Sequence, residues 1–485
     1  FYRSENLETV AFPAASNPSE LTIGEYAFAS CPHLSTVTFN ETGTMGTETV
    51  EDVLYYVYQA EQSCGIVEIG AHAFEDCPEI GEIVLPSTLE LLGDYAFAED
   101  EGLQDLDLSH IHYELEFGLY PFENCTGLTS VEITDNVGEI EFYAVFHGCS
   151  NLADFTVGPN NPNYSADDQG VIYNRDRTTL IYFPEGYDEA TDGIYQIPST
   201  VTRIGGAAFE GKSNLTQITI PATVTVIAEN AFANCPNLAT VTFDPADGEP
   251  LTIDTYAFYG CGKLTSITLP ARTTSIGNYS FAATTTAGAN GGLTSVTLNE
   301  GLTTIGEYAF RGQKGITSIT IPSTVTSIGA SAFAYSGLTG VNPVKFTQPS
   351  SGARTGLTLG DYVFAGTSIK EFTLPEGLAY IPEYAFNVCT SLTKVVIPTT
   401  VTNNNASGIW AIGYRAFNGC SSLTDVQFTA GGTLPLSIGI NAFEDCTQLT
   451  SLTLPARASS FTSAQTYDVF EMPEANSREN PNFMG

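Results

Sequence analysis

The dipeptide Ala-Phe, or a close variant of it, recurs along the whole chain at short and nearly constant intervals. The hexamer "IGEYAF" occurs at Ile23–Phe28 and again, unchanged, at Ile305–Phe310. Most neighbouring repeats place their Phe 22 to 26 residues apart, and 23 is the commonest interval. A fixed period of this length predicts a solenoid, in which each coil stacks on the next. The repeat Phe residues are Phe28, Phe74, Phe97, Phe122, Phe146, Phe209, Phe232, Phe258, Phe281, Phe310, Phe333, Phe364, Phe386, Phe417, Phe443 and Phe470.

One clean unit, "LTQITIPATVTVIAENAFANC", occupies Leu215–Cys235. The alternation in L-x-x-I-x-I predicts a β-strand, and the following Pro predicts its end because Pro cannot donate to a ladder. "VTVI" predicts a second short extended segment, and "AENAFANC" predicts a compact turn or one helical turn. Stacked coils would place each repeat Phe on its counterpart in a buried ladder. Gly after Ile, as in Gly277 and Gly306, is interpreted as the turn residue, and Glu307 and Tyr308 as exposed and free to vary.

The shared template is L-x-x-I-x-I-P-x-x-V-x-x-I-x-x-x-A-F, often followed by x-x-C-x-x-L, and it resembles the BspA-like leucine-rich repeat family. The resemblance covers nearly the whole chain, and the insert Asn161–Gly186 resembles an interruption common in that family. It implies a right-handed leucine-rich-repeat coil with a parallel β-sheet on one face. Short turns or single helical turns would form the other face, with few long helices. It also implies a secreted or surface-attached protein that acts in adhesion or protein binding.

The predicted domain organisation is a single elongated solenoid over residues 1–485, with about 16 coils. Inserts near residues 40–66 and 158–196 lengthen two repeat intervals to 46 and 63 residues, enough for an extra coil or a hairpin. Residues 471–485 are expected to form an irregular C-terminal tail. Inserted loops are where a solenoid often carries its specificity.

The charge of the chain excludes some classes of partner. The sequence holds 55 Asp and Glu against 16 Lys and Arg, a net charge of −39. Such a surface repels phosphate backbones and anionic lipid headgroups, so no nucleic-acid partner is expected. No apolar run reaches the roughly 18 residues of a membrane span, so no membrane insertion is expected either. A strongly acidic surface suits a soluble extracellular or salty setting.

One exposed pattern points to a binding surface. A Thr often occupies the strand position between the last two inward residues, which predicts an uncharged ladder of hydroxyl groups. We expect this face to bind a protein or glycan ligand, and β-propensity with solubility is the alternative explanation. The Thr residues of this predicted face are Thr219, Thr242, Thr268, Thr297 and Thr320.

Motifs that carry chemistry are scarce. In "SHIHYELEF", a strand would place His110, His112, Glu114 and Glu116 on one face, and imidazoles with carboxylates are transition-metal ligands. Solvated charges on a strand face are the competing interpretation. The sequence has no Ser-His-Asp order, phosphate loop or metalloprotease motif. We therefore expect no catalytic residue and no cofactor, and the protein is predicted not to be an enzyme.

Nine of the ten Cys lie three residues after a repeat Phe and are interpreted as small buried residues of a ladder. Disulfides between adjacent coils, such as Cys125–Cys149 or Cys235–Cys261, are the alternative in an oxidising compartment. Cys64 lies off the pattern, in an insert. Six N-x-S/T sequons would carry glycans if the source is a eukaryotic secretory protein. They are Asn40, Asn124, Asn163, Asn214, Asn278 and Asn405.

The two ends of the chain are half-units of the repeat, at Asn6–Pro13 and Thr466–Pro473, and neither resembles a polar cap. Two explanations stay open: the chain is a fragment of a longer protein, or copies stack head to tail in a filament. The favoured function is a non-enzymatic, secreted or surface-displayed protein for adhesion or recognition. The alternative function is a structural subunit of an extracellular filament.

Overall fold

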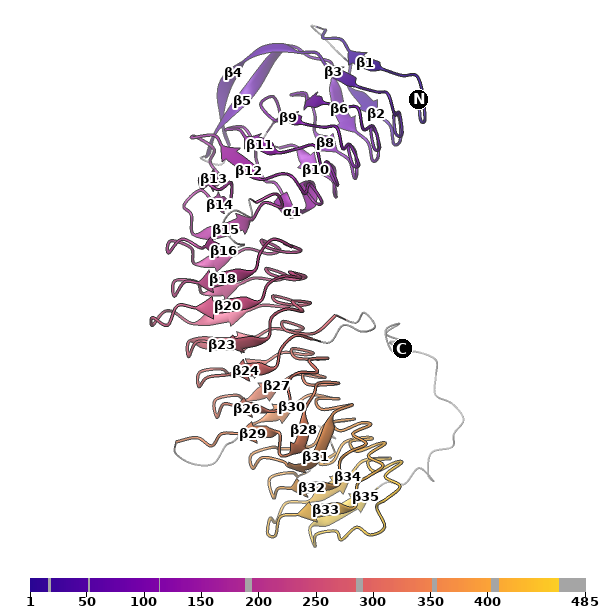
Figure 1. Cartoon of the computed structure of the whole chain (residues 1–485), viewed down its shortest axis with the longest axis vertical. Coiled ribbons are helices and arrows are strands. Elements are labelled where there is room, and N and C mark those ends of the chain that lie inside the picture. The colour runs from indigo at the N-terminus through magenta and orange to yellow at the C-terminus, as the bar shows by residue number, and fades with distance from the viewer. Residues whose placement is uncertain are drawn as a thin grey trace. The chain divides into compact units, whose positions relative to one another are not determined.

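The computed structural model describes residues 1–15, 19–50, 53–112, 114–187, 194–284, 291–350, 356–402 and 410–461. The predicted tail at 471–485, the repeat Phe470 and the sequon Asn405 lie outside these ranges. The chain divides into two compact units (Figure 1). Unit 1 comprises Phe1–Gly193 and Thr200–Phe209, and unit 2 comprises Ile194–Ser199 and Glu210–Gly485. That both units belong to one continuous solenoid stays a prediction.

Each unit is a stack of β-coils, so the predicted fold class is confirmed. The sequence unit Leu215–Cys235 forms β18 (Gln217–Ile220) and β19 (Val226–Ile227), followed by a turn that carries Phe232. The two predicted strand segments are therefore both present, and each stacks on its counterpart in the next coil. We call the faces built by these two sets of strands the first-strand face and the second-strand face.

In unit 1 the neighbouring strands of both faces pair in parallel. The first strands form the pairs β1 (Thr9–Phe12) with β3 (Thr36–Phe39), β7 (Glu82–Val84) with β9 (Asp105–Asp107), and β11 (Ser130–Ile133) with β12 (Asp154–Val157). The second strands form one sheet in the order β10 (Glu116–Phe117), β8 (Leu91–Leu92), β6 (Ile66–Ile69) and β2 (Leu21–Ile23).

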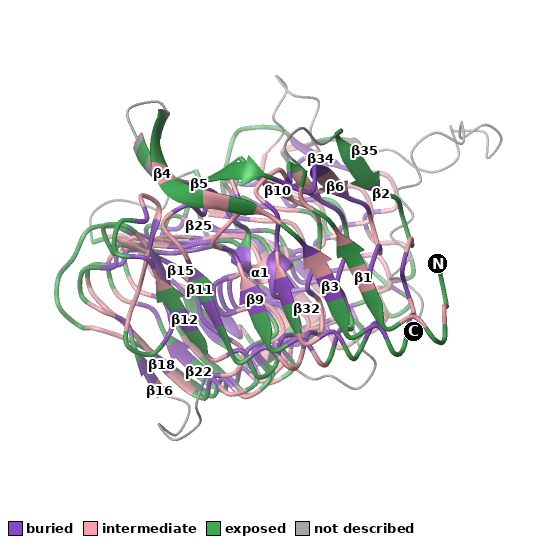
Figure 2. Cartoon of the chain, turned by 90° about the horizontal axis from the view of Figure 1, so that it is seen from above, coloured by how far each residue is buried: buried purple, intermediate pink, exposed green. Residues whose placement is uncertain are grey.

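Both predicted inserts of unit 1 contain antiparallel strands. The first forms a long hairpin of β4 (Thr42–Val50) and β5 (Val53–Gln62), which pair only with each other among the described strands. The second contains β13 (Tyr164–Ala166), β14 (Ile172–Asn174) and β15 (Thr179–Tyr182), and β15 then pairs in parallel with β17 (Arg203–Ile204). The hairpin projects from the stack and is largely exposed (Figure 2).

Unit 2 repeats the two-faced arrangement. Its first strands include β16 (Ile194–Gln196), β18, β20 (Thr240–Phe243), β22 (Ser266–Thr268), β24 (Ser295–Thr297), β26 (Ile319–Ile321), β28 (Thr339–Val341), β29 (Val344–Phe346), β31 (Ser368–Thr373), β32 (Lys394–Ile397) and β33 (Asp425–Phe428). Its second strands are β19, β21 (Leu251–Ile253), β23 (Thr273–Ile276), β25 (Thr304–Ile305), β27 (Ser327–Ile328) and β30 (Thr358–Leu359), with β34 (Leu436–Ile438) and β35 (Ala458–Phe461) as a separate pair.

The predicted Phe ladder forms the core of each unit. The rings of Phe258, Phe281 and Phe310 are fully or almost fully buried, and successive centroids lie 5.2 and 5.4 Å apart with nearly parallel planes. Phe74 and Phe97 stack in the same way in unit 1, 5.0 Å apart. The turn is also bonded from coil to coil, because the Phe310 amide donates to the Ala332 carbonyl at 2.8 Å. Helix is almost absent: the described residues hold one four-residue helix, α1 (Phe142–Val145), and no helix long and apolar enough to cross a membrane.

The interpretation of the hexamer turn was wrong in one respect. The left-handed residue is Tyr308, with φ +58°, and Gly306 does not adopt a positive φ. A Cβ on Gly306 would lie 2.5 Å from the carbonyl carbon of Gly277 in the preceding coil. Gly is therefore required there because two backbones approach closely, and the Tyr is constrained by its conformation.

Candidate binding surfaces

The predicted Thr residues lie on the first-strand face of unit 2, one on each of five strands. Thr219 and Thr242 are register partners on β18 and β20, and Thr268 and Thr297 are register partners on β22 and β24. Thr320 follows on β26. Thr219 is half-buried and the other four are exposed, while the residues on either side of each Thr point mostly inward. The structure thus places all five residues on one kind of surface within one unit.

The hydroxyl groups of this face differ in how they are used. Thr219 and Thr242 bond to each other, with 2.8 Å between their Oγ1 atoms. No hydrogen bond joins the Oγ1 of Thr268, Thr297 or Thr320 to another atom of the described chain. These three hydroxyls are free to meet a ligand.

Thr residues on the second-strand face have a structural task instead. The hydroxyl of Thr303 donates to the Thr274 carbonyl at 2.9 Å, and Thr358 donates to the Thr326 carbonyl at 3.2 Å. Each of these bonds ties one coil to the coil before it. The hydroxyl groups of the two Thr ladders therefore differ in their hydrogen bonding, although both ladders consist of Thr residues that recur with the repeat.

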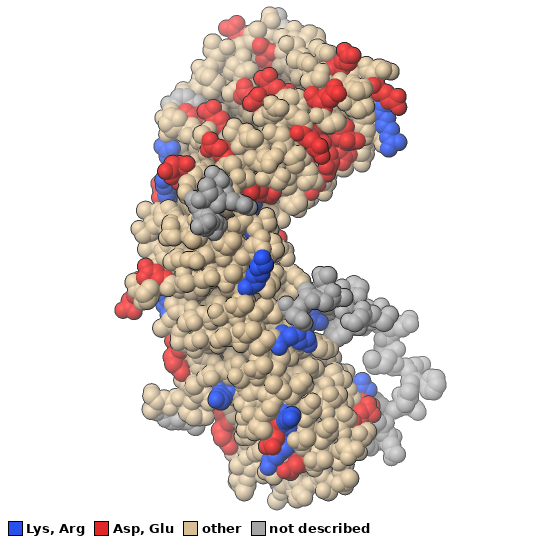
Figure 3. Space-filling view, in the orientation of Figure 1, with Lys and Arg blue, Asp and Glu red and all other residues tan. Residues whose placement is uncertain are grey.

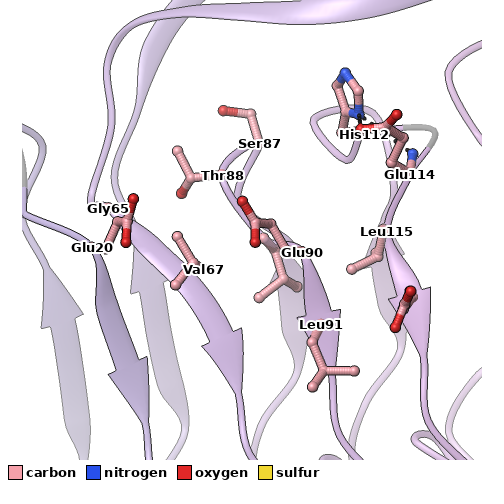
Figure 4. Close-up of a pocket in the computed structure, with 12 residues that line it drawn as sticks. Glu20, Gly65, Val67, Ser87, Thr88, Glu90, Leu91, His112, Glu114 and Leu115 are labelled. Carbon is pink, nitrogen blue, oxygen red and sulfur yellow. Dashed lines mark hydrogen bonds and ion pairs between the residues drawn. The ribbon is translucent and has the colours of Figure 1, made fainter.

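A second candidate surface is a groove on the second-strand face of unit 1. Two hollows, of about 1130 and 1040 Å³, adjoin each other and share Glu114, Leu115 and Glu116 as lining residues. We call the two together the acidic groove. Figure 4 shows Val67 and Leu91 on neighbouring strands, Glu20 and Glu90 directly before β2 and β8, and His112 and Glu114 beside them. The repeat pattern did not indicate this groove, because its lining residues share no repeated residue type at one position of the coil.

The base of the hairpin is fastened beside this groove through Glu41. Its side chain is 0% exposed, and its carboxylate accepts hydrogen bonds from the Ser87 amide and hydroxyl, both at 3.0 Å. His110 Nδ1 lies 3.5 Å from the same carboxylate, and the His110 ring stacks on Tyr58 of β5 at 3.8 Å between centroids. Burial, with Glu41 and Glu61 nearby, raises the pKa of Tyr58. Residues of the insert and of two later coils thus form one polar contact.

The histidine and glutamate residues predicted as weak metal ligands are separated by these contacts. His110 faces Glu41, whereas His112 lies 3.5 Å from Glu48 of the hairpin and 3.8 Å from Glu114. Only Glu116 belongs to a strand, so the segment is not the extended strand on which the prediction depended. Within the described ranges, no group of three or more His, Cys, Asp or Glu side chains is arranged to hold a metal ion.

The charges are distributed unevenly between the two units. Unit 1 has 36 Asp and Glu against 4 Lys and Arg, and unit 2 has 19 against 12. The net charges are therefore −32 and −7. In Figure 3 the acidic side chains are dense over the coils of unit 1 and sparse over those of unit 2.

The ladder Cys residues are buried free thiols that act as hydrogen-bond donors. Cys125 Sγ donates to the Phe97 carbonyl and Cys261 Sγ to the Phe232 carbonyl, at 3.1 and 3.0 Å. Each thiol reaches the Phe of the preceding coil. Burial raises the pKa of Cys389 to about 11, which keeps this thiol protonated and unreactive at neutral pH. Cys64, which lies off the pattern, is also buried and free.

The sequons differ in how accessible their amide nitrogens are. Asn278 is exposed and uses its carbonyl oxygen to accept from the Glu307 amide at 2.8 Å. Asn163 Nδ2 is buried, and Asn214 is half-buried. The amides of Asn40 and Asn124 donate to the Phe12 carbonyl and to Glu99. Glycosylation stays a prediction, and Asn40 and Asn278 are the exposed residues among these five sites.

Besides the acidic groove, two sets of residues were missed by sequence reasoning. The Tyr before Ala-Phe forms an outer aromatic ladder: Tyr279 and Tyr308 stack 4.4 Å apart, as do Tyr362 and Tyr384. Burial, followed by the neighbouring Tyr308 and Tyr256, raises the pKa of Tyr279 to about 12. The recurrence of Tyr two residues before Phe was the available signal.

The second missed set consists of two separate carboxyl groups, Asp100 and Glu300, whose pKa values are shifted in opposite directions. Asp100 takes the ladder position of a Cys, is 0% exposed and accepts from the Cys77 amide at 2.6 Å. Burial raises its pKa well above the usual range. Glu300 accepts hydrogen bonds from Ser323, Thr324 and Thr347. Although burial opposes the shift, these bonds lower the pKa of Glu300 to about 2.

Comparison with known proteins gives one strong match. A sequence profile described as a BspA-type leucine-rich repeat region of six copies matches residues 1–56, 67–196, 191–290, 285–349 and 357–464. No curated protein matches the chain.

Solved structures similar to this chain include three from bacteria. A leucine-rich repeat protein from Bacteroides ovatus is 22% identical, over 88% of this chain and 99% of that one, with a TM-score of 0.43. The pneumococcal vaccine antigen PcpA is 19% identical over 68% and 77%, with a TM-score of 0.39. A leucine-rich cell surface protein from Faecalibacterium prausnitzii is 20% identical over 81% and 95%, with a TM-score of 0.34. At these TM-scores the similarities support no inference about a site or a partner.

Proposed function

The chain belongs to the BspA-type leucine-rich repeat family, and from that premise we propose that it is a non-enzymatic surface recognition protein. Leucine-rich repeat solenoids are typically non-catalytic and mediate protein binding. We propose that this chain is displayed outside the cell and binds a protein or glycan ligand through the first-strand face of unit 2.

The free hydroxyls of Thr268, Thr297 and Thr320 are the observation that supports this proposal. They lie on exposed, uncharged strand positions, and no group of the described chain occupies them. A row of hydroxyls on rigid parallel strands can bond a ligand without the cost of ordering flexible side chains. The Thr residues of the second-strand face lack this property, because their hydroxyls bond to main-chain carbonyls.

The test uses Arg substitutions, which block the face by size and charge. Thr268→Arg, Thr297→Arg and Thr320→Arg are combined in the full chain, and binding is measured to panels of immobilised glycans and extracellular matrix proteins. Thr303→Arg, Thr326→Arg and Thr358→Arg on the second-strand face are the matched control. We expect the first variant to lose a binding signal that the control retains. Equal binding by the first-strand variant and the second-strand variant would contradict the proposal.

The filament alternative has no supporting observation of this kind. It depends on the C-terminal half-unit Thr466–Pro473, which lies outside the described residues. Head-to-tail self-association therefore stays a prediction.

A further inference from the structure

The acidic groove of unit 1 is independent of the Thr face and has its own chemistry. We propose that it binds an extended polypeptide segment rich in Lys or Arg. One part of the groove is lined by residues in or next to the strands of the sheet β10-β8-β6-β2, and its other part includes residues of β13, β14 and β15.

The groove is lined by both apolar and anionic side chains. Val67, Leu91, Phe117 and Ile181 line it as half-buried side chains. Exposed carboxylates adjoin these apolar residues along the chain, as Glu90 adjoins Leu91 and Glu116 adjoins Phe117. Such a surface suits the aliphatic stems and charged heads of Lys and Arg, which bury one part and expose the other.

Five carboxylates of the groove have no cation of their own. Over the described residues, the side chains of Glu20, Glu90, Glu116, Glu139 and Glu141 make no ion pair and no side-chain hydrogen bond. By contrast, Glu114 in the same groove lies 3.8 Å from His112, and Glu123 outside it pairs with His147 at 2.9 Å. These five carboxylates therefore leave uncompensated negative charge in the groove.

Charge complementarity decides the occupant. Unit 1 carries a net charge of −32, so its field attracts cationic segments and repels acidic ones. The lining includes one Arg, Arg175, whose guanidinium donates to the Asn161 carbonyl at 3.0 Å. An anionic or neutral occupant would leave the carboxylates unpaired.

The length of the groove fits a short extended segment. Glu20, Val67, Glu90, Glu116 and Glu139 come from five successive segments of the stack, and stacked strands lie about 4.8 Å apart. The track is therefore about 20 Å long, which corresponds to about six residues of extended chain.

The experiment measures binding of a labelled peptide of alternating lysine and valine to the full chain by fluorescence anisotropy. The groove variant combines Glu90→Gln, Glu116→Gln and Glu139→Gln. Its matched control combines Glu82→Gln, Asp105→Asn and Glu132→Gln, three exposed carboxylates on the first-strand face of the same unit. Both variants lose three negative charges and no ion pair or side-chain hydrogen bond within the described chain, and circular dichroism checks that both are folded.

We expect the groove variant to weaken binding about tenfold or more and the control by less than about threefold. A peptide of alternating glutamate and valine should not bind. Equal weakening by both variants would show diffuse charge attraction and overturn the proposal, as would displacement of the peptide by spermine at an equal concentration of positive charge. The Arg variants of the Thr face should bind this peptide normally, so failure here and failure of the proposed function are separate results.

Discussion

Unit 1 and unit 2 are built from the same coil, yet one carries a net charge of −32 and the other of −7. Their interiors are built in the same way. Both have stacked Phe rings about 5 Å apart and thiols that donate to a carbonyl of the preceding coil. Their outward residues differ, with unpaired carboxylates in unit 1 and free Thr hydroxyls in unit 2. In a stack, only inward residues must match their neighbours, so outward residues can diverge at little cost to stability.

The largest expected effect tests whether the interiors are equivalent. Phe97→Ala in unit 1 and Phe232→Ala in unit 2 should each lower the free energy of unfolding by about 3 to 5 kcal/mol, because both rings are fully buried. Urea unfolding followed by circular dichroism measures this. Tyr308→Asn is the control, since Asn230 and Asn441 adopt the same left-handed conformation. If only one of the two Phe substitutions lowered the free energy of unfolding, the interiors of the two units would not be equivalent.

The next prediction concerns the pH response of unit 1. The pKa of Asp100 is raised in the folded state, so the folded protein holds this proton more tightly than the unfolded chain. Stability from this group is therefore greatest at low pH and falls as the pH rises above the usual Asp value. Asp100→Asn should remove this fall, so the stability of the variant should change less than that of the wild type between about pH 5 and pH 8.

Urea unfolding of wild type and Asp100→Asn at those two pH values checks the prediction. The Asn side chain keeps an acceptor for the Cys77 amide, so the variant tests the charge and not the hydrogen bond. Parallel stability curves for the two proteins would contradict the assignment.

Unit 2 should respond to pH with the opposite sign through Glu300. Its pKa is lowered to about 2, so its contribution is complete above the unfolded value of 4.5 and is lost as the pH falls toward 2. Glu300→Ala should cost about 1 kcal/mol at neutral pH, a modest value because the carboxylate is exposed. Hydrogen exchange of the Ser323 and Thr324 amides at about pH 6 and pH 3 measures the effect. Unchanged protection in the variant at pH 6 would refute the role of the carboxylate.

The smallest expected effect is a difference in salt sensitivity. Self-repulsion of carboxylates destabilises unit 1 more than unit 2, and salt screens it over about 10 Å at 0.1 M. Raising the NaCl concentration should therefore slow hydrogen exchange in unit 1 by a few-fold and leave unit 2 nearly unchanged. Equal slowing in both units would mean that the charge difference has no energetic consequence.

Part of the candidate surfaces was visible in the sequence. The period placed Thr268 and Thr297 on one strand face, and the structure finds them as register partners. The period could not show that Thr303, on the second-strand face, donates its hydroxyl to a carbonyl of the preceding coil. That distinction depends on the distance between stacked backbones, which a repeat pattern does not give.

The sequence by itself determined the coil, the Phe ladder and the position of the Cys residues, because inward side chains must repeat with the coil for the stack to close. The tertiary structure alone decided the acidic groove and the fastening of the hairpin. Glu41, Ser87 and His110 meet although an insert separates them, and an insert breaks the period from which neighbours can be inferred. The tertiary structure also decided the roles within the hexamer. Tyr308 is its left-handed residue. Gly306 is the residue whose backbone lies too close to the preceding coil to leave room for a Cβ.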